Sequence, residues 1–283
     1  MLEGRCMAVV KSVSFYKDES ITHDHSVMYK PDDKNFNFHT HDICEIIFLK
    51  SGDVSAIIGE KSYKMQKNSL VIFRANVPHR IRIDGSKFYE RHNILFDENE
   101  LANGIFNKLP QELDLINCNG NRRITELFEK IDYYYSNFKG MDLKILVTNT
   151  IEEILYNLYV EPLEKFNVNQ ISVHPTISSA VDYINKHYTE PVTIDDICHE
   201  VCVTKSHLHH LFMENMKISP KKYINMKRLS KAQKLIAMGE KPTAIYVDCG
   251  FTDYGTFFRN YTSHFGYTPS QKDEIAIERK IES

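Results

Sequence analysis

Three histidines and one glutamate in the first third of the chain are the residues best suited to coordination or ligand-binding chemistry. His39, His41 and Glu45 are close in sequence, and His79 follows at a distance. Residues two apart on a strand share a face, so His39 and His41 lie together, and Glu45 joins them if the strand continues. Such a set can ligate Zn²⁺, Mn²⁺, Fe²⁺ or Ni²⁺, or hydrogen-bond a small ligand. Three interpretations stay open: ligand binding without a metal, metal-assisted binding, and a purely structural polar group.

A pair of helix-turn-helix patterns in the last hundred residues is the second informative feature. In the first pattern, Thr193 and Asp196 have the spacing of a capping box, and Thr204 is a suitable N-cap for the following helix. Leu208 and Phe212 are placed to bury that helix. Its outer face keeps small hydrogen-bonding side chains, which is what the major groove of DNA admits.

The second pattern follows further along the chain. Gly250 stands where the chain needs a positive φ between two helices, and Phe251 is placed to fill the corner. Thr252 or Asp253 caps the next helix, and Phe257 starts the aromatic face that packs it. The pattern therefore predicts a second short helix with an exposed outer face.

These two patterns resemble the DNA-binding domain of the AraC family of transcription regulators. The family's closing signature is matched by Gly250, Phe251, Asp253, Phe257, Arg259, Tyr261, Phe265, Gly266, Thr268 and Pro269. The helix between the two units matches as well, from Ser219-Pro220 to Ala232. The resemblance covers residues 176–272 and implies a domain that binds double-stranded DNA in a sequence-specific way.

The resemblance also implies which residues face DNA. They are Thr204, Lys205, Ser206, His209 and His210 in the first unit, and Thr252, Tyr254, Gly255, Thr256 and Arg259 in the second. His210 replaces an arginine that the family commonly has, and a neutral imidazole carries no charge to neutralise phosphate. Lys205 is a better candidate for phosphate contact than for base reading.

The histidine-rich segment resembles a different domain. Residues Phe38 to Glu45, followed by Gly52, resemble the first cupin motif, and Pro78-His79 resembles the start of the second. Regulators of the AraC type carry a cupin sensing domain at this place in the chain. The resemblance implies that the four residues described first line one pocket and bind a small-molecule effector, for which a sugar or related metabolite is our expectation.

Two folding patterns divide the chain. From about residue 26 to 96, short β-rich runs alternate with turns, whereas helical periodicity appears after Phe96 on either side of a polar linker. Expected helices near 124–138 and 147–158 either cap the barrel or pair between subunits. We therefore expect an α+β protein, with a cupin-like β-barrel and a helical extension, then an all-α domain with two helix-turn-helix motifs joined by a linking helix.

The predicted organisation has four parts. They are a sensing domain over residues 1–97, a helical dimerisation and coupling region over 98–162, a linker over 163–175 and a DNA-binding domain over 176–283. The linker is assigned from its polar, proline-containing composition. The helices expected after it cover about 176–188, 194–201, 204–215, 220–237, 242–248, 253–264 and 269–279.

Charge and composition fit this organisation. The whole chain has a net charge of −3, but residues 176–272 hold 12 Lys and Arg against 9 Asp and Glu. A mildly basic second half is compatible with DNA binding. No apolar run approaches the ~18 residues of a membrane span, and the N-terminus lacks a signal pattern, so we expect a cytoplasmic protein without a membrane partner. The 6 cysteines form no disulfide or zinc pattern.

The sequence thus predicts an effector-controlled transcription regulator, and the family resemblance favours an activator. We expect a homodimer, because the apolar helical faces exceed what one capping helix needs, and RNA polymerase as a further partner. We expect no enzyme activity and no cofactor, while a divalent metal at the four-residue pocket stays open. The alternatives are a cupin metalloenzyme fused to a DNA-binding domain, and a thiol-based stress sensor.

Overall fold

The computed structural model describes residues 9–18, 21–85, 87–99, 101, 104–162, 164, 166, 170–171 and 174–271. Its strands are β1 (Val9–Lys17), β2 (Ile21–Tyr29), β3 (Cys44–Ser51), β4 (Val54–Ile58), β5 (Lys61–Lys64), β6 (Ser69–Phe73), β7 (His79–Ile83), β8 (Phe88–Phe96), β9 (Leu115–Asn117) and β10 (Gln170–Ile171). Its helices are α1 (Ile105–Lys108), α2 (Arg122–Asn137), α3 (Gly140–Tyr159), α4 (Pro175–His187), α5 (Ile194–Glu200), α6 (Lys205–Asn215), α7 (Pro220–Ala237), α8 (Pro242–Ile245) and α9 (Tyr254–Phe265). The α+β class predicted from the sequence is confirmed.

The strands described form two antiparallel sheets. One sheet has the order β1-β2-β8-β3-β6-β9 and the other the order β10-β5-β4-β7. Buried apolar side chains from both sheets pack in one cluster, which includes Ile47, Leu49, Val54 and Tyr63. The expected barrel therefore takes the form of two facing sheets.

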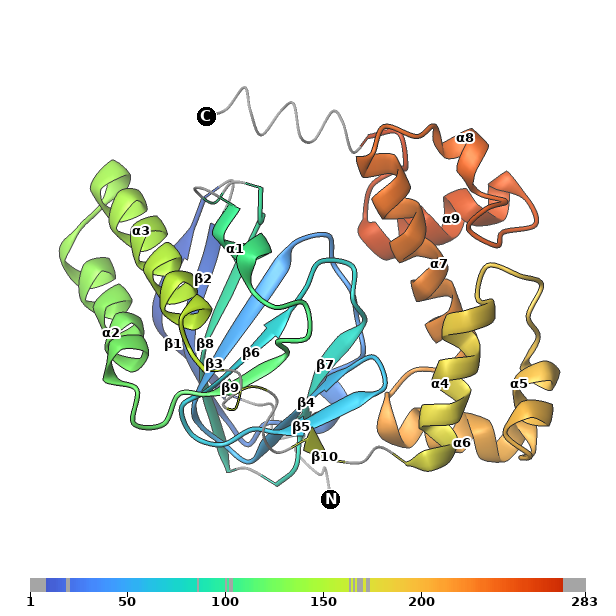
Figure 1. The fold of residues 1–283 in the computed structure, drawn as a ribbon, viewed down its shortest axis with the longest axis horizontal. Coiled ribbons are helices and arrows are strands. Elements are labelled where there is room, and N and C mark those ends of the chain that lie inside the picture. The colour runs from blue at the N-terminus through green and yellow to red at the C-terminus, as the bar shows by residue number, and fades with distance from the viewer. Residues whose placement is uncertain are drawn as a thin grey trace, which may run out of the picture.

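Strand β3 is buried on both of its faces. Ile46 and Phe48 belong to the cluster that the helices cover, whereas Ile47 and Leu49 belong to the cluster between the sheets. The ring of Phe48 stacks on Phe128 of α2 with centroids 4.1 Å apart. Helices α2 and α3 thus cover the outer face of the larger sheet, and the C-terminal helices lie on the opposite side of the sandwich (Figure 1).

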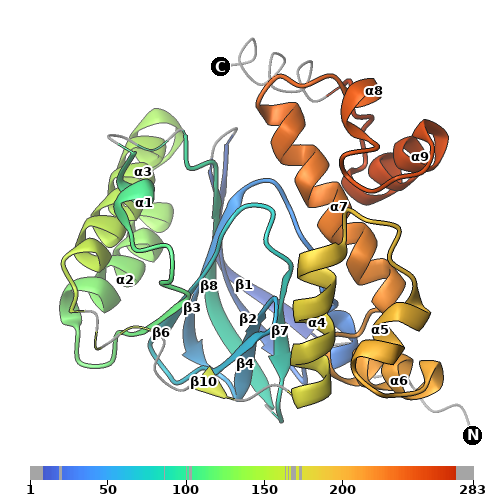
Figure 2. The same cartoon turned by 45° about the vertical axis from the view of Figure 1, so that its right-hand side comes forward.

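The C-terminal helices form two helix-turn-helix units that share α7. Thr193 caps α5 in a complete capping box with Asp196, Thr204 caps α6, and Asp253 caps α9. Each side-chain oxygen accepts a hydrogen bond from a free backbone N–H of the first helical turn. The caps that the sequence predicts are therefore formed. Figure 2 shows α7 running from the first unit, α4 to α6, to the second, α8 and α9.

Several boundaries differ from those expected from the sequence. Gly59 and Glu60 form the turn between β4 and β5, and β5 begins directly after it as the second strand of a hairpin. The residues of β10 fall inside the expected linker and pair with β5. Of the helix expected over 269–279, residues 269–271 form a turn, and the rest lies outside the described residues. None of the helices described is long and apolar enough to cross a membrane.

We predict that Gly250→Ala destabilises the protein far more than Gly239→Ala. Both glycines have a positive φ, +87° and +90°, but a Cβ at Gly250 would lie 2.8 Å from the carbonyl oxygen of Tyr188, whereas Gly239 has open space around it. Backbone strain costs about 1–2 kcal/mol at either site, and overpacking adds about 1–3 kcal/mol at Gly250. Chemical denaturation of both variants measures the difference, and equal losses would contradict the tight contact.

Candidate functional site

The structure brings the four predicted pocket residues together at the edge of the two sheets. His39 and His41 precede β3, Glu45 lies in β3, and His79 begins β7. The backbones of His39 and His79 pair in an isolated bridge, with N–O distances of 3.0 Å in both directions. His39 is exposed, His41 is half-buried, and Glu45 and His79 are buried. One ligand atom from each of the four lies within 4.8 Å of the others.

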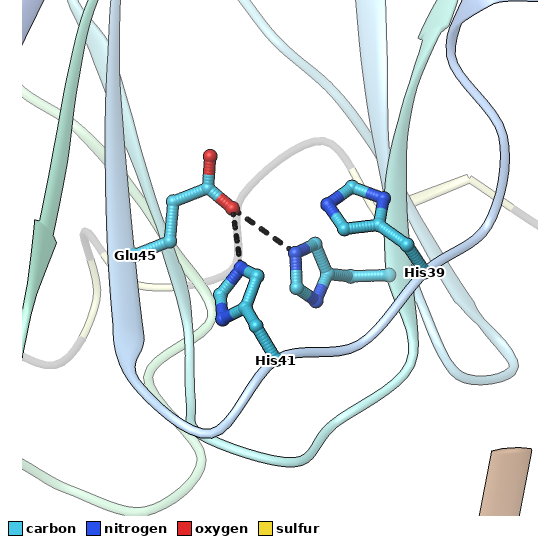
Figure 3. A group of neighbouring side chains, drawn as sticks. His39, His41 and Glu45 are labelled. Atoms are coloured by element: carbon cyan, nitrogen blue, oxygen red, sulfur yellow. Dashed lines mark hydrogen bonds and ion pairs between the residues drawn. The ribbon is translucent and has the colours of Figure 1, made fainter. Parts of the chain in front are cut away.

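Glu45 is the acceptor on which two of the rings converge. Its Oε2 lies 3.1 Å from Nε2 of His41 and 3.0 Å from Nε2 of His79. Figure 3 shows the carboxylate of Glu45 and the ring of His41 pointing toward each other.

The opposite nitrogen of each ring is held by a backbone carbonyl. Nδ1 of His39, His41 and His79 donates to the oxygens of Asn37, Ile43 and Val77 at 2.9, 2.8 and 2.7 Å. A neutral imidazole carries one proton, so a ring that donates from Nδ1 presents a lone pair at Nε2. The Nε2 atoms of His41 and His79 therefore face Glu45 either as imidazolium donors or as lone pairs around a bound cation.

Electrostatics favours the charged form of Glu45 and His41. Burial alone would raise the pKa of Glu45, but the hydrogen bonds from His41 and His79 outweigh it and hold that pKa well below its usual range. Burial alone would lower the pKa of His41, but the hydrogen bond and charge of Glu45 raise it. The site therefore holds a buried carboxylate paired with an imidazolium, and a bound cation would take the place of the imidazolium proton.

The donor set fits a divalent metal ion. Three imidazoles and one carboxylate suit Zn²⁺, Mn²⁺, Fe²⁺ or Ni²⁺. Each ring is also oriented by a hydrogen bond from its other nitrogen to a carbonyl, an arrangement typical of metal-binding histidines. Metal-assisted binding is thus compatible with the geometry.

A cavity of about 200 Å³ lies beside this group inside the sandwich. Its wall includes His39, Glu45 and His79, together with Tyr89, Arg91 and Asn93 of β8. The Tyr89 hydroxyl and the Asn93 Oδ1 atom are buried without a hydrogen-bond partner. An unpaired buried polar atom is costly, so these two groups are suited to meeting a ligand.

Sequence reasoning missed these three β8 residues. They occupy alternate positions, and this spacing places their side chains on one face of the strand. That alternation was the available signal, although the intervening His92 is polar as well and obscures it. His41, which was expected in the pocket, contacts Glu45 but does not line the cavity.

The outer faces of α6 and α9 form the second candidate site. In the first unit, the predicted residues of α6 and its cap are all exposed: Thr204, Lys205, Ser206, His209 and His210. Two of them have acidic neighbours: Lys205 pairs with Asp195 at 2.8 Å and His210 with Glu214 at 3.0 Å.

On the second unit, Thr252, Gly255 and Arg259 are exposed, whereas Tyr254 and Thr256 are half-buried. The Tyr254 ring lies 5.8 Å from that of Phe257 between centroids, so its side chain contributes to packing. Arg259 donates from Nη2 to the Thr256 hydroxyl at 3.1 Å, which leaves most of its guanidinium free for another partner.

A polar seam joins the two candidate sites. Asp42, directly after His41, accepts from Gln233 of α7 at 2.9 Å and from the hydroxyl of Tyr267 at 3.2 Å. On the other side of the histidine motif, buried Phe38 packs among residues of the first helix-turn-helix unit. The segment that carries the pocket histidines is therefore held by the C-terminal domain at both ends.

Comparison with known proteins agrees with these two parts. A family described as "Cupin domain" matches residues 25–89, and one described as "Helix-turn-helix domain" matches residues 197–274. The lactose operon transcription activator of Staphylococcus xylosus is 33% identical over 138 residues, which are 48% of this chain and 50% of that protein. The HTH-type transcriptional activator RhaS of Escherichia fergusonii is 21% identical over 94% of this chain and 96% of its own length.

Among solved structures, ToxT from Vibrio cholerae O395 aligns with 94% of this chain and 97% of its own, at 16% identity and a TM-score of 0.38. The fold and the two matches define a cupin domain joined to a double helix-turn-helix domain. The chain is thus similar in sequence to transcriptional activators, over about half of its length in one case and over nearly all of it in the other.

We predict that Glu45→Gln lowers the pKa of His41, because the carboxylate that stabilises its imidazolium is lost while its burial remains. Titration of the histidine ring signals by NMR measures this shift. His25 provides an internal control, since Asp132 and Glu90 raise its pKa against the effect of burial, and neither is changed. An unchanged His41 titration would contradict the role of Glu45.

Proposed function

We propose that the chain is an effector-controlled, sequence-specific DNA-binding regulator that reads DNA through α6 and α9. The observation that carries this proposal is that two short helices expose small polar faces while α7 joins their units. Helix α7 has 18 residues and is therefore about 27 Å long. This length approaches the ~34 Å between successive major grooves on one side of DNA. The ten residues predicted to face DNA, which lie in or directly before α6 and α9, are the proposed DNA contacts.

The effector is proposed to bind in the cavity beside His39, Glu45 and His79. The cavity volume of about 200 Å³ lies below the usual range of roughly 300–1,000 Å³, so a small ligand is expected. Tyr89, Arg91 and Asn93 add hydrogen-bonding groups that suit hydroxyl or carboxylate substituents. Relatives include a lactose operon activator and a melibiose operon regulatory protein, which supports a sugar or related metabolite as the effector and activation as the outcome.

The polar seam provides a route between the two sites. A ligand that moves the His39–Glu45 segment also moves Phe38 and Asp42, which contact the C-terminal domain. Because Gln233 lies on α7, the arrangement of the two helix-turn-helix units changes with it. Effector binding is therefore proposed to shift the balance between two domain arrangements.

We propose that the chain has no enzyme activity, because its relatives are transcription regulators. A cupin metalloenzyme stays the second candidate, and the four-residue donor set favours it. Metal analysis of the purified protein distinguishes the two. Stoichiometric Fe or Mn with turnover of a small substrate would support the enzyme.

The remaining partners follow from the regulatory role. The proposed division at residues 1–97, 98–162, 163–175 and 176–283 assigns dimerisation to the second part. On α3, Met141, Ile145, Tyr156 and Tyr159 are exposed and lie within one narrow sector of the helix. We propose that the chain forms a homodimer through this stripe. We also propose that it contacts RNA polymerase as an activator and that it is located in the cytoplasm, where the chromosome lies.

We predict that Arg259→Ala weakens operator binding by about 1–3 kcal/mol if the guanidinium reads a guanine edge. Binding to random DNA should then change less. Mobility shifts on both DNAs measure the two effects. Arg123→Ala, which removes an exposed arginine of α2 far from the DNA-facing helices in sequence, is the matched control. Unchanged affinity for both DNAs would exclude a contact by Arg259.

We predict that His39→Ala combined with His79→Ala abolishes the effector response. Both residues line the cavity, whereas the DNA-facing helices are untouched. Reporter expression against inducer concentration measures the response, and DNA affinity of a fragment from residue 170 onward serves as the reference. A normal induction curve would show that these histidines are structural.

We predict that Ile145→Glu with Tyr156→Glu converts a dimer into a monomer. The two side chains are 50% and 40% exposed on the α3 stripe, and charges there must be desolvated in a dimer. Sedimentation velocity without DNA measures the change. Val247→Glu, at an exposed apolar position of the C-terminal domain, is the control and should leave the dimer intact. A wild-type monomer under all conditions would contradict the assignment.

A further inference from the structure

A second histidine cluster lies on the face of the large sheet opposite the cavity. His23 and His25 are two apart on β2, and His25 is the cross-strand partner of His92 on β8. The strands direct these rings toward α2, which contributes Asp132. The three histidines are 0%, 5% and 0% exposed. The pocket described above includes none of the four.

The hydrogen bonds link these side chains into one group. Nδ1 of His25 donates to Asp132 at 2.8 Å, and its Nε2 donates to Glu90 at 3.2 Å. The rings of His25 and His92 stack with centroids 3.9 Å apart. His23 Nε2 and His92 Nδ1 share a hydrogen bond of 3.0 Å. One ligand atom each from His25, His92 and Asp132 lies within 4.8 Å of the others.

Two buried nitrogens of this group have no partner. They are Nδ1 of His23 and Nε2 of His92. A buried polar atom without a partner costs free energy, and an apolar ring would fill the same space without that cost. The pairing of His92 Nδ1 with His23 also fixes the ring in the way that an outer partner fixes a metal-binding histidine. His92 Nε2 is thus the nitrogen left available for a ligand.

We propose that His25, His92 and Asp132 bind a Zn²⁺ ion between the sheet and α2, with His23 positioning His92. Two imidazole nitrogens and a carboxylate oxygen are ligands that zinc prefers. The ion would replace the proton that His25 now donates from Nδ1 to Asp132. Asp132 and Glu90 are 26% and 29% exposed at their side chains, which leaves an entry path from solvent.

The site connects two separate elements. Asp132 lies on α2, whereas the histidines lie on the sheet, so an ion there crosslinks the helix to the strands. Ser14 of β1 also donates to Asp132, at 2.6 Å. Zinc would therefore fix α2 against β1, β2 and β8, and would stabilise the folded protein by mass action.

The test uses the full-length chain with His39→Ala and His79→Ala, so that zinc at the cavity does not contribute. After chelation, equilibrium dialysis with Zn²⁺ should give one ion per chain and a raised Tm. Adding Asp132→Ala should remove the bound ion, and adding His23→Ala should weaken binding by about 10–100-fold. Glu126→Ala, an exposed acidic change on the same helix, is the matched control and should bind like the background.

The outcomes separate clearly. Because Asp132 is partly exposed on a helix, its replacement should preserve the fold, and far-UV circular dichroism checks this. His92→Phe gives a second variant that fills the same space without a nitrogen and should also lose the ion. If the background chain binds no Zn²⁺, or if folded Asp132→Ala and His92→Phe bind it as tightly as the background, the proposal is overturned.

Discussion

The alternation of strand β3 is the constraint on which the sensing domain depends. Ile46 and Phe48 face the helices, and Ile47 and Leu49 face the second sheet. Glu45 shares the face of Ile47, and both line the cavity. A slip of one residue would exchange the two faces and remove the carboxylate from the histidines. Each large apolar side chain of these cores contributes about 1.5–3 kcal/mol on burial, so the register that forms the cores also fixes the buried charge.

Strand β8 divides the polar groups in the same way. Tyr89, Arg91 and Asn93 face the cavity, whereas the intervening His92 faces α2. The cavity and the second histidine cluster therefore lie on opposite faces of one sheet, and β8 contributes to both. Because β8 pairs with β2 on one side and β3 on the other, the strands that carry Glu45 and the second histidine cluster are held in one continuous ladder, whereas His79 lies on β7 of the other sheet. The hydrogen-bonded sheet is rigid and close-packed. A structural change at the cavity face must therefore displace the backbone of β8 before it affects the histidines on the α2 face.

The sequence predicted the parts whose signals are local. Caps at Thr193 and Thr204 and the positive φ at Gly250 are set by neighbouring residues, and α4 to α7 begin and end within about a residue or two of expectation. The lining of the cavity by β8 was not predicted, because polar residues on both faces remove the alternation in hydropathy. The contact of Asp42 with Gln233 joins positions 191 residues apart, and no local pattern encodes such a pair.

The free energy of the hydrogen bonds in the polar seam is comparable with the binding free energy that a small effector supplies. Its described contacts with Asp42 are two hydrogen bonds to one carboxylate, each worth about 1.5–3 kcal/mol. Lys217 adds an ion pair with Asp33 at 3.3 Å between partly exposed side chains. Moving a two-state equilibrium from 1:99 to 99:1 requires about 5.5 kcal/mol of differential binding. The two hydrogen bonds to Asp42 are of the same order, and buried Phe38 adds apolar packing against the first helix-turn-helix unit.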